Sequence, residues 1–358
     1  MFGLRLNYYF TLKTLSRIEI LLLDNNYANL NLSKFKTKIF NQQEIYLKIF
    51  LKSLFIYFFG KTKKKLKEIY LNEFFLIIRP KIIIGHHYNN LIFKAKKYAP
   101  ESKIVLYLHT RLYQSQFNYL KKKSQDTHID YFFVCDGLHK KMLSKYYKSK
   151  FIINGLVKNN EIHLLKKKSK YDILYISEYR NVKYPKKKIH FKYIKYIAKV
   201  LNQYSIANQK KIAIALNSSR IDKNIPPKKE INFFKNIAPN LKSLVNTNSY
   251  EAGNISELIV CLNSNLGADL LARNKKVLFL PYLFNHGEEF KNPYFNKKIP
   301  FVLKSRNKKL IFDKIDYLLK LNKLDWEKKL KKSKIKIVFD EKNLILKKEL
   351  YKIIKDQI

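Results

Sequence analysis

The chain has 358 residues, 46% of them hydrophobic, and its 73 Lys and Arg against 27 Asp and Glu give a formal net charge of +46. The length suffices for two domains with a sizeable core, and the composition excludes disordered and fibrous classes. The charge favours an anionic partner, namely a phosphorylated substrate, an acidic lipid or a nucleic acid.

Short apolar runs alternate with helical patterns in the first half of the chain. The expected strands are residues 18–23, 81–85, 103–108, 130–135 and 151–154. Helices are expected within 40–78, where there are two, over 88–98, and from the fourth strand to residue 147. Strands separated by helices predict βαβ units and a parallel sheet.

Residues 45–59 form an apolar segment that Lys48 and Lys52 interrupt and that a basic run, 61–65, follows. The segment is too short to span a bilayer. Two interpretations remain open. It is either a buried helix on the domain core, or a monotopic helix that lies on an anionic membrane with its lysines at the headgroups.

The alternating pattern starts again after a basic, polar stretch at 156–170, which we take as a linker. The expected strands are 171–176, 211–216, 258–262 and 276–280, and the expected helices are 190–204, 228–237, 266–273, 308–320, 326–334 and 341–355. We therefore predict an α/β protein of two Rossmann-like domains that face each other across a cleft, residues 1–160 and 161–358, the second with closing C-terminal helices. In such sheets ligands bind beyond the carboxyl ends of the strands.

The cysteines and the N-terminal residues bear on the cellular compartment. Cys135 and Cys261 are far apart and each lies in an apolar run, which predicts buried free thiols and a reducing compartment. No Cys/His spacing matches a zinc site, so no metal is expected. Residues 1–15 lack the apolar core of a secretory signal, and we expect a cytoplasmic protein.

The polar turn Asn263-Ser264-Asn265 lies between an expected strand and an expected helix. Free N–H groups at the positive end of a helix dipole suit an anion such as a phosphate. Gly267 would let a ligand approach the backbone, and Asp269 could accept hydrogen bonds from a ribose or serve the helix dipole. Alternatively, Ser264 is only the N-cap of the helix.

Other polar groups also follow expected strands, where the site of an open α/β sheet lies. They are His86, His87, His109, Thr110, Arg111, Asp136, Ser177, Glu178, Arg180 and Asn217. His109 is our candidate general base because its ordinary pKa suits proton transfer near neutrality. Asp136 could be a base or could cap the helix after it, and Arg180 could bind a phosphate or form a surface ion pair.

Four segments of the chain, residues 130–139, 153–160, 172–180 and 264–277, resemble segments of bacterial surface-carbohydrate and capsule polysaccharide biosynthesis transferases. Residues 264–277 resemble their Ser-Thr-Leu-Gly-x-Glu-x-x-Ala-Arg-Gly-Lys-Lys-Val signature, 172–180 their Leu-(Phe/Tyr)-Ile-Ser-Gln-(Phe/Tyr)-Arg segment, 153–160 their Gly-Ser-x-Lys-Asn-Asn turn, and 130–139 the strand before that turn. The similarity runs in order from about residue 82 to 276. Asn265 and Asp269 stand where these proteins have Thr and Glu, which changes the reach of both side chains and leaves the donor preference open.

The resemblance implies a GT-B-like glycosyltransferase with an N-terminal acceptor domain and a C-terminal nucleotide-sugar domain. It implies a metal-independent reaction in which the helix dipole and basic side chains stabilise the leaving phosphate. Carried over, the donor side comprises Ser177, Arg180, Asn217, Ser264, Asn265, Leu266, Gly267 and Asp269. The acceptor side comprises His86, His87 and Arg111, and the catalytic candidates are His109 and Asp136.

The leading interpretation is therefore an enzyme, a glycosyltransferase that moves a sugar from a nucleotide-sugar to a surface glycan or lipid-linked acceptor. No cofactor is expected, since the nucleotide-sugar is a substrate, and the inner face of the cytoplasmic membrane is a candidate partner. One alternative is a sugar-nucleotide epimerase or polyol-phosphate transferase of the same architecture. Another is a basic nucleic-acid-binding protein, although the lysines are dispersed and match no known module, so no nucleic acid is expected.

Overall fold

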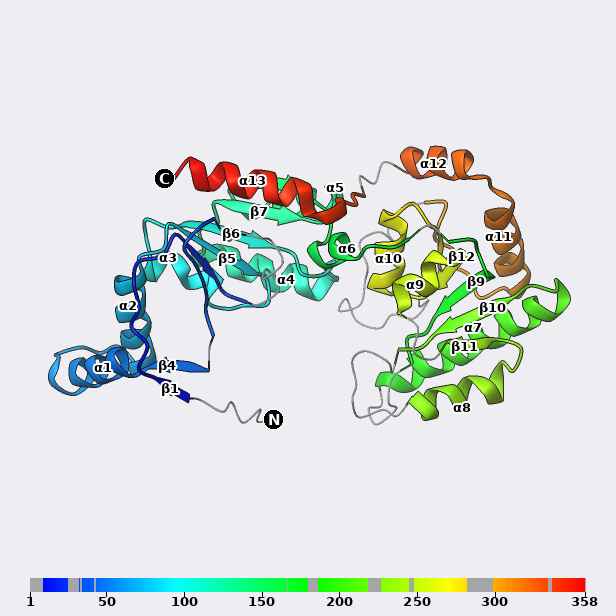
Figure 1. Cartoon of the computed structure of the whole chain (residues 1–358). Helices are drawn as coiled ribbons and strands as arrows, with labels where there is room; N and C mark the ends of the chain where they lie inside the picture. The colour runs from blue at the N-terminus through cyan, green and yellow to red at the C-terminus, as the bar shows by residue number, and fades with distance from the viewer. Residues whose placement is uncertain are drawn as a thin grey trace.

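The computed structural model describes residues 9–24, 32, 34–41, 43–165, 167–179, 186–217, 227–244, 248–281, 299–333 and 337–357. These residues form two large parallel sheets with helices on their faces and one small two-stranded sheet (Figure 1). The predicted fold class, α/β with two Rossmann-like sheets, is confirmed. Both cysteines are buried free thiols, as predicted.

The first sheet has six parallel strands in the order β3-β2-β5-β6-β7-β8. They are β2 (Ile20–Leu22), β3 (Thr37–Ile39), β5 (Ile82–His86), β6 (Lys103–Tyr107), β7 (Tyr131–Val134) and β8 (Lys150–Ile153). The helices of this half are α1 (Leu47–Phe59), α2 (Leu66–Ile78), α3 (Ala95–Tyr98), α4 (Gln114–Lys123), α5 (Gly137–Leu143) and α6 (Val157–Glu161). A separate two-stranded sheet pairs β1 (Tyr9–Thr11) with β4 (Glu44–Tyr46) just before α1.

The second sheet has five parallel strands in the order β11-β10-β9-β12-β13. They are β9 (Tyr171–Ile176), β10 (Ile212–Ala215), β11 (Lys242–Leu244), β12 (Ser256–Cys261) and β13 (Lys276–Phe279). Its helices are α7 (Lys186–Ala207), α8 (Pro227–Ile237), α9 (Ser249–Asn254) and α10 (Asn265–Ala272), followed by α11 (Lys308–Lys320), α12 (Lys323–Lys332) and α13 (Leu344–Lys355). The central strands β9 and β12 are buried along most of their length, as strands covered on both faces must be.

The last helix, α13, packs on the first sheet and not on the second (Figure 1). Its buried side chains recur at helical spacing and contact the core formed by β2, β5, β6 and β7; they are Leu346, Leu350, Ile353 and Ile354. The sequence prediction assigned this helix to the C-terminal domain, whereas in the structure its buried side chains pack against strands of the first sheet, together with Leu32 and Val157. The boundary at 160/161 itself stays a prediction.

Helix α1 is not a buried core helix. Only Ile49 and Ser53 of its thirteen residues are buried, so the first of the two interpretations of residues 45–59 is wrong. Among the described helices, none combines the length and the apolarity that a membrane span requires.

Candidate active site between the two sheets

A cavity of about 380 Å³ lies between the halves, at the carboxyl ends of strands from both sheets. The first half contributes His109, Thr110, Tyr113, Leu156, Lys158 and Asn159. The second half contributes Ile176, Ser177, Glu178, Ala215, Leu216, Asn217, Ser249, Tyr250, Asn263, Ser264, Asn265, Leu266 and Asp269. This is the position where open parallel sheets bind their ligands.

The structure brings seven of the predicted site residues together in this lining: His109, Ser177, Asn217, Ser264, Asn265, Leu266 and Asp269. Arg180 lies outside the described residues. His86, His87, Arg111, Asp136 and Gly267 lie elsewhere, and their surroundings are described below.

The N-terminus of α10 opens onto the cavity. Ser264 is its N-cap, and its Oγ accepts a hydrogen bond from the backbone N–H of Leu266 at 3.2 Å. The N-cap interpretation and the anion-site interpretation of this turn are therefore compatible, because a capped first turn still directs N–H dipoles towards the cavity. Ser264 and Asn265 are only partly buried, which leaves their polar groups accessible from the cavity.

Ser177 and Glu178 at the end of β9 hold the neighbouring loops in place. The Ser177 hydroxyl donates to the buried carboxylate of Glu230, which also accepts the backbone N–H of Asn217 at 3.0 Å. Glu178 accepts the backbone N–H of Asn263 at 2.5 Å. The segment after β9 is thus tied to the turn before α10 through Glu178, and to the segment after β10 through Glu230 of α8.

Arg111 and Asp269 form a buried ion pair that joins the two halves. The Tyr250 hydroxyl donates to the second carboxylate oxygen at 2.8 Å, so both oxygens of Asp269 are engaged. Arg111 is 2% exposed and Asp269 is 6% exposed. The predicted ribose contact of Asp269 and acceptor contact of Arg111 stay predictions; what the structure shows is a link between domains at the edge of the cavity.

Packing inside the protein requires a glycine at position 267. A Cβ at this position would overlap Sγ of Cys261 and come within 3.3 Å of the Phe279 ring. The absence of a side chain thus lets α10 lie close against β12 and β13. The sequence interpretation, in which Gly267 admits a ligand to the backbone, is not the reason that this structure gives.

Three histidines gather at the carboxyl ends of β5 and β6. The backbone N–H of His109 donates to Nδ1 of His87 at 3.2 Å, and the His86 and His109 rings have centroids 5.5 Å apart. Nδ1 of His86 accepts the N–H of Tyr88 at 3.0 Å, which leaves its Nε2 facing Asp24 at 3.9 Å. Of the three, His109 lines the cavity.

Burial controls the protonation of this cluster. It lowers the pKa of His109, and the charges of His86 and Lys158 lower it further. It also lowers the pKa of His87 to about 3, again with help from the two neighbouring imidazoles. A neutral imidazole at neutral pH has a free lone pair, so His109 has the protonation state that a general base needs.

Asp136 is the N-cap of α5 and lies away from the cavity. Its carboxylate accepts the backbone N–H and ring Nδ1 of His139, each at 2.8 Å, and both side chains are fully buried. Nε2 of His139 accepts the N–H of Leu112 at 3.0 Å. The capping alternative is what the structure shows, and the pair supports the loop that carries Arg111.

Cys135, Asp136 and His139 place three potential metal-ligand atoms within 4.8 Å of one another. The Cys135 thiol faces Asp136 at 3.2 Å, and burial raises its pKa well above the ordinary value. A protonated thiol is a poor ligand, and the carboxylate and imidazole satisfy each other. The cluster fits a hydrogen-bonded support better than a metal site.

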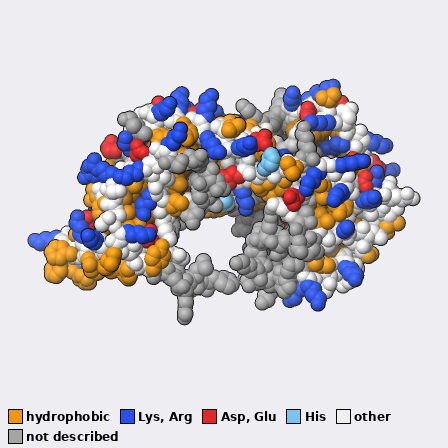
Figure 2. Space-filling view, in the orientation of Figure 1, with side chains coloured by type: hydrophobic (Ala, Val, Ile, Leu, Met, Phe, Trp, Pro, Cys, Tyr) orange, Lys and Arg blue, Asp and Glu red, His pale blue; other side chains and the backbone are white. Residues whose placement is uncertain are grey.

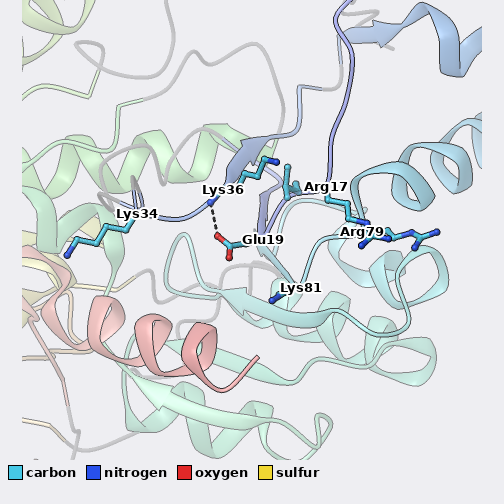
Figure 3. A pocket seen from close by; sticks show the side chains of 7 residues that line it. Arg17, Glu19, Lys34, Lys36, Arg79 and Lys81 are labelled. Atoms are coloured by element: carbon cyan, nitrogen blue, oxygen red, sulfur yellow. Dashed lines mark hydrogen bonds between the residues drawn. The ribbon is translucent and has the colours of Figure 1, made fainter. Parts of the chain in front are cut away.

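A second cavity, of about 570 Å³, lies at the amino ends of β2, β3 and β5 (Figure 3). It is strongly basic; its lining is Arg17, Ile18, Glu19, Lys34, Lys36, Arg79 and Lys81. Glu19 accepts the backbone N–H of Lys36 at 2.8 Å. Because parallel sheets bind substrates at the opposite end, the cavity between the halves is the better active-site candidate.

Sequence reasoning missed several groups of the lining. Tyr113 donates its hydroxyl to the Asn263 carbonyl across the halves at 3.1 Å, and Lys158 is the lysine among the described residues of the lining. Tyr113 has no local pattern that distinguishes it from other surface tyrosines. Lys158 was visible only as the lysine of the segment 153–160, and sequence reasoning assigned it no role of its own. Glu178 was visible as a strand-end residue, but its bond to the turn before α10 was not.

Two parallel sheets with a polar cavity between their carboxyl ends define a GT-B-like protein. The sequence model of a family described as "putative O-antigen biosynthesis protein" matches residues 111–354. The chain belongs to this family. No curated protein sequence matches it significantly.

Solved structures show the same architecture at low sequence identity. The Staphylococcus aureus MnaA–UDP structure has a TM-score of 0.55 and 14% identity, covering 95% of this chain and 98% of that one. The Methanocaldococcus jannaschii UDP-GlcNAc 2-epimerase has a TM-score of 0.53 and 12% identity, with 94% and 100% covered. The wall teichoic acid polymerase TagF has a TM-score of 0.50 and 9% identity, with 96% and 90% covered. These likenesses confirm the GT-B-like fold.

Proposed function

We propose that this protein is a glycosyltransferase that moves a sugar from a nucleotide-sugar to a surface-glycan or lipid-linked acceptor in O-antigen-type biosynthesis. The observation that carries the proposal is the arrangement of the cavity: the N-terminus of α10, with Ser264 and Asn265, belongs to one half, and His109 belongs to the other. An anion site and a neutral base that share one cavity are the two groups that this reaction requires.

The donor phosphates would lie at the N-terminus of α10. Their negative charge would be stabilised there by backbone N–H groups, by the Ser264 and Asn265 side chains and by the Lys158 ammonium. In the reaction the acceptor hydroxyl oxygen forms a bond to the anomeric carbon while its proton passes to His109. The bond from the anomeric carbon to the phosphate oxygen breaks, and the nucleotide leaves with the electron pair. The dipole and Lys158 stabilise that leaving group, the role a cation has in metal-dependent enzymes.

Names of the similar structures support a nucleotide-sugar ligand, since one holds UDP and another acts on UDP-GlcNAc. Epimerisation at carbon 2 needs groups that move protons on the sugar itself. The acidic residues of the described lining are Glu178 and Asp269, and both already bond protein groups. This favours transfer over epimerisation. A nucleotide-sugar donor would also place the reaction in the cytoplasm.

Thermal-shift titration with UDP-, GDP- and CMP-sugars and CDP-glycerol tests the donor site. At least one nucleotide should stabilise the wild type, and Ser264→Ala with Asn265→Ala should weaken that binding at least tenfold. Ser144→Ala, at an exposed serine that bonds only its own helix, is the matched control. Equal binding by the double variant and the control would contradict the assignment.

The reaction itself is tested with the donor so identified. His109→Ala should keep donor binding and lose at least a hundredfold in transfer, because removal of a general base costs about 10² to 10⁴ in rate. Conversion of UDP-GlcNAc to its 2-epimer without an acceptor would establish the epimerase instead. Transfer of glycerol phosphate from CDP-glycerol would establish a polyol-phosphate transferase.

A further inference from the structure

Helix α1 carries large apolar side chains on the face that it turns towards solvent. Leu51, Phe55, Phe58 and Phe59 are 55%, 65%, 70% and 75% exposed. Their spacing of three to four residues places them along one stripe of the helix. Folded proteins expose single apolar residues commonly, but a continuous stripe of four large ones marks a surface that another body covers.

The opposite face of α1 makes the arrangement unusual. Ser53 is fully buried there, and its hydroxyl donates to the backbone carbonyl of Ile49 at 2.6 Å. The helix thus buries a serine while it exposes three phenylalanines. A helix selected only to cover the protein core has the reverse distribution, so the exposed stripe has another use.

The exposed apolar surface continues beyond α1 onto the small sheet. The Phe10 ring, 55% exposed, meets the Phe50 ring edge-on with centroids 5.4 Å apart, and Leu12 next to this strand is 75% exposed. We call the exposed side chains of Phe10, Leu12, Leu51, Phe55, Tyr57, Phe58 and Phe59 the apolar platform. Figure 2 shows hydrophobic atoms gathered at the end of the molecule where Figure 1 places α1 and β4.

Positive charge surrounds this platform. Lys48 and Lys52 lie on α1, the segment after it adds Lys61, Lys63, Lys64 and Lys65, and Lys67 lies in the first turn of α2. All are exposed, and Lys52 pairs with Glu73 of α2 at 2.7 Å. There is no Asp or Glu from residue 47 to 67. A second copy of this chain would bring the same positive rim against it, which disfavours self-association. An apolar surface with a lysine rim complements an anionic bilayer. The lipid acyl chains surround the aromatic rings, and the anionic headgroups attract the lysine ammonium groups.

We propose that α1 docks the protein on an anionic lipid bilayer, with the apolar platform in the headgroup–acyl boundary and the lysine rim on the phosphates. The helix has 13 residues and is therefore roughly 20 Å long, short of the roughly 30 Å of a hydrocarbon core. It lies in the interface and does not cross it. Docking does not depend on the transfer reaction.

The test is sedimentation of the full chain with phosphatidylcholine vesicles that contain or lack phosphatidylglycerol, without any nucleotide. The wild type should bind the anionic vesicles, and binding should weaken as salt rises. The combined change Phe55→Ser, Phe58→Ser and Phe59→Ser should reduce the partition coefficient at least tenfold. Leu324→Ser with Leu344→Ser, at exposed leucines of α12 and α13, is the matched apolar control and should bind as the wild type does.

Charge is tested separately. Lys63→Gln, Lys64→Gln and Lys65→Gln together should reduce binding roughly a hundredfold, and the matched change of Lys328, Lys331 and Lys332 on α12 should not. Thermal midpoints within a few degrees of the wild type verify folding, since all these side chains are exposed. Equal reduction by both lysine triples would show non-specific charge attraction and overturn the proposal. A wild-type dimer that the phenylalanine changes dissociate, with no vesicle binding, would assign the platform to a second copy.

Discussion

We expect acid to lower the unfolding free energy of this protein, in part through protonation of His87 in the unfolded chain. The variant His87→Asn should remove the share of that loss that His87 contributes. The His87 imidazole is 1% exposed, and its Nδ1 accepts the backbone N–H of His109 at 3.2 Å. A proton there would add a buried charge beside two other imidazoles. The pKa of His87 is accordingly lowered from 6.5 to about 3.

The sign and size follow from proton linkage. In the unfolded chain the imidazole takes up a proton below its ordinary pKa, whereas in the folded protein it stays neutral until about pH 3. The contribution to stability is therefore complete above pH 6.5 and is lost as the pH falls towards the folded pKa. Two pH units below the unfolded pKa, at pH 4.5, the loss relative to pH 8 is about 2.7 kcal/mol. The pKa of His86 and that of His109 are also lowered, so these residues add loss in the same direction.

Urea denaturation at pH 8 and pH 4.5 measures this difference. The wild type should lose at least about 2.7 kcal/mol of unfolding free energy between the two, and His87→Asn should lose about that much less. Asn keeps an oxygen that can accept the N–H of His109 but does not titrate. His163→Asn is the control, because that imidazole is 65% exposed in the folded protein. A pH difference for His87→Asn within about 0.5 kcal/mol of the wild-type value would refute the reasoning.

Two further predictions concern buried packing and charge. Arg111→Ala leaves the Asp269 carboxylate buried without its cation, so the unfolding free energy should fall by about 3–5 kcal/mol; a loss under 1 kcal/mol would show that water reaches the pair. Gly267→Ala forces a methyl against Cys261 and should cost about 1–3 kcal/mol. Adding Cys261→Ala should recover part of that cost in a double-mutant cycle, and strictly additive losses would place the clash elsewhere.

The sequence predicts the two sheets well where strands are long and apolar throughout. Of the described three-residue strands it finds the apolar Ile20–Leu22 but misses Tyr9–Thr11, Thr37–Ile39, Glu44–Tyr46 and Lys242–Leu244, because their mixed polar composition matches no strand pattern. It also misplaces α13. The spacing of apolar residues shows that this helix covers a sheet, but nothing in that spacing specifies which of the two.

The same limit applies to the candidate site. Polar residues at strand ends are visible in the sequence, because topology alone places them at one edge, and His109, Ser177, Asn217 and Ser264 do line the cavity. The pair Arg111–Asp269 joins residues 158 positions apart, and no local signal encodes it. Gly267 could be picked out in the sequence, but its reason could not. A close-packed sulfur atom and an approaching ligand would each require a glycine at this position.

The buried pair also links the two candidate chemical groups. Arg111 follows His109 by two residues on one loop, and Asp269 lies in the same short helix that Ser264 caps. The ion pair therefore sets the position of the candidate base and of the candidate anion site at once. Asn159 adds a second tie, since its side-chain amide donates to the Asp269 carbonyl at 3.3 Å and its oxygen accepts from Arg273 at 2.8 Å. Asp269 stands where the signature that residues 264–277 resemble has Glu, and in this fold its carboxylate bonds Arg111 of the other half and so helps to hold the two halves together around the cavity.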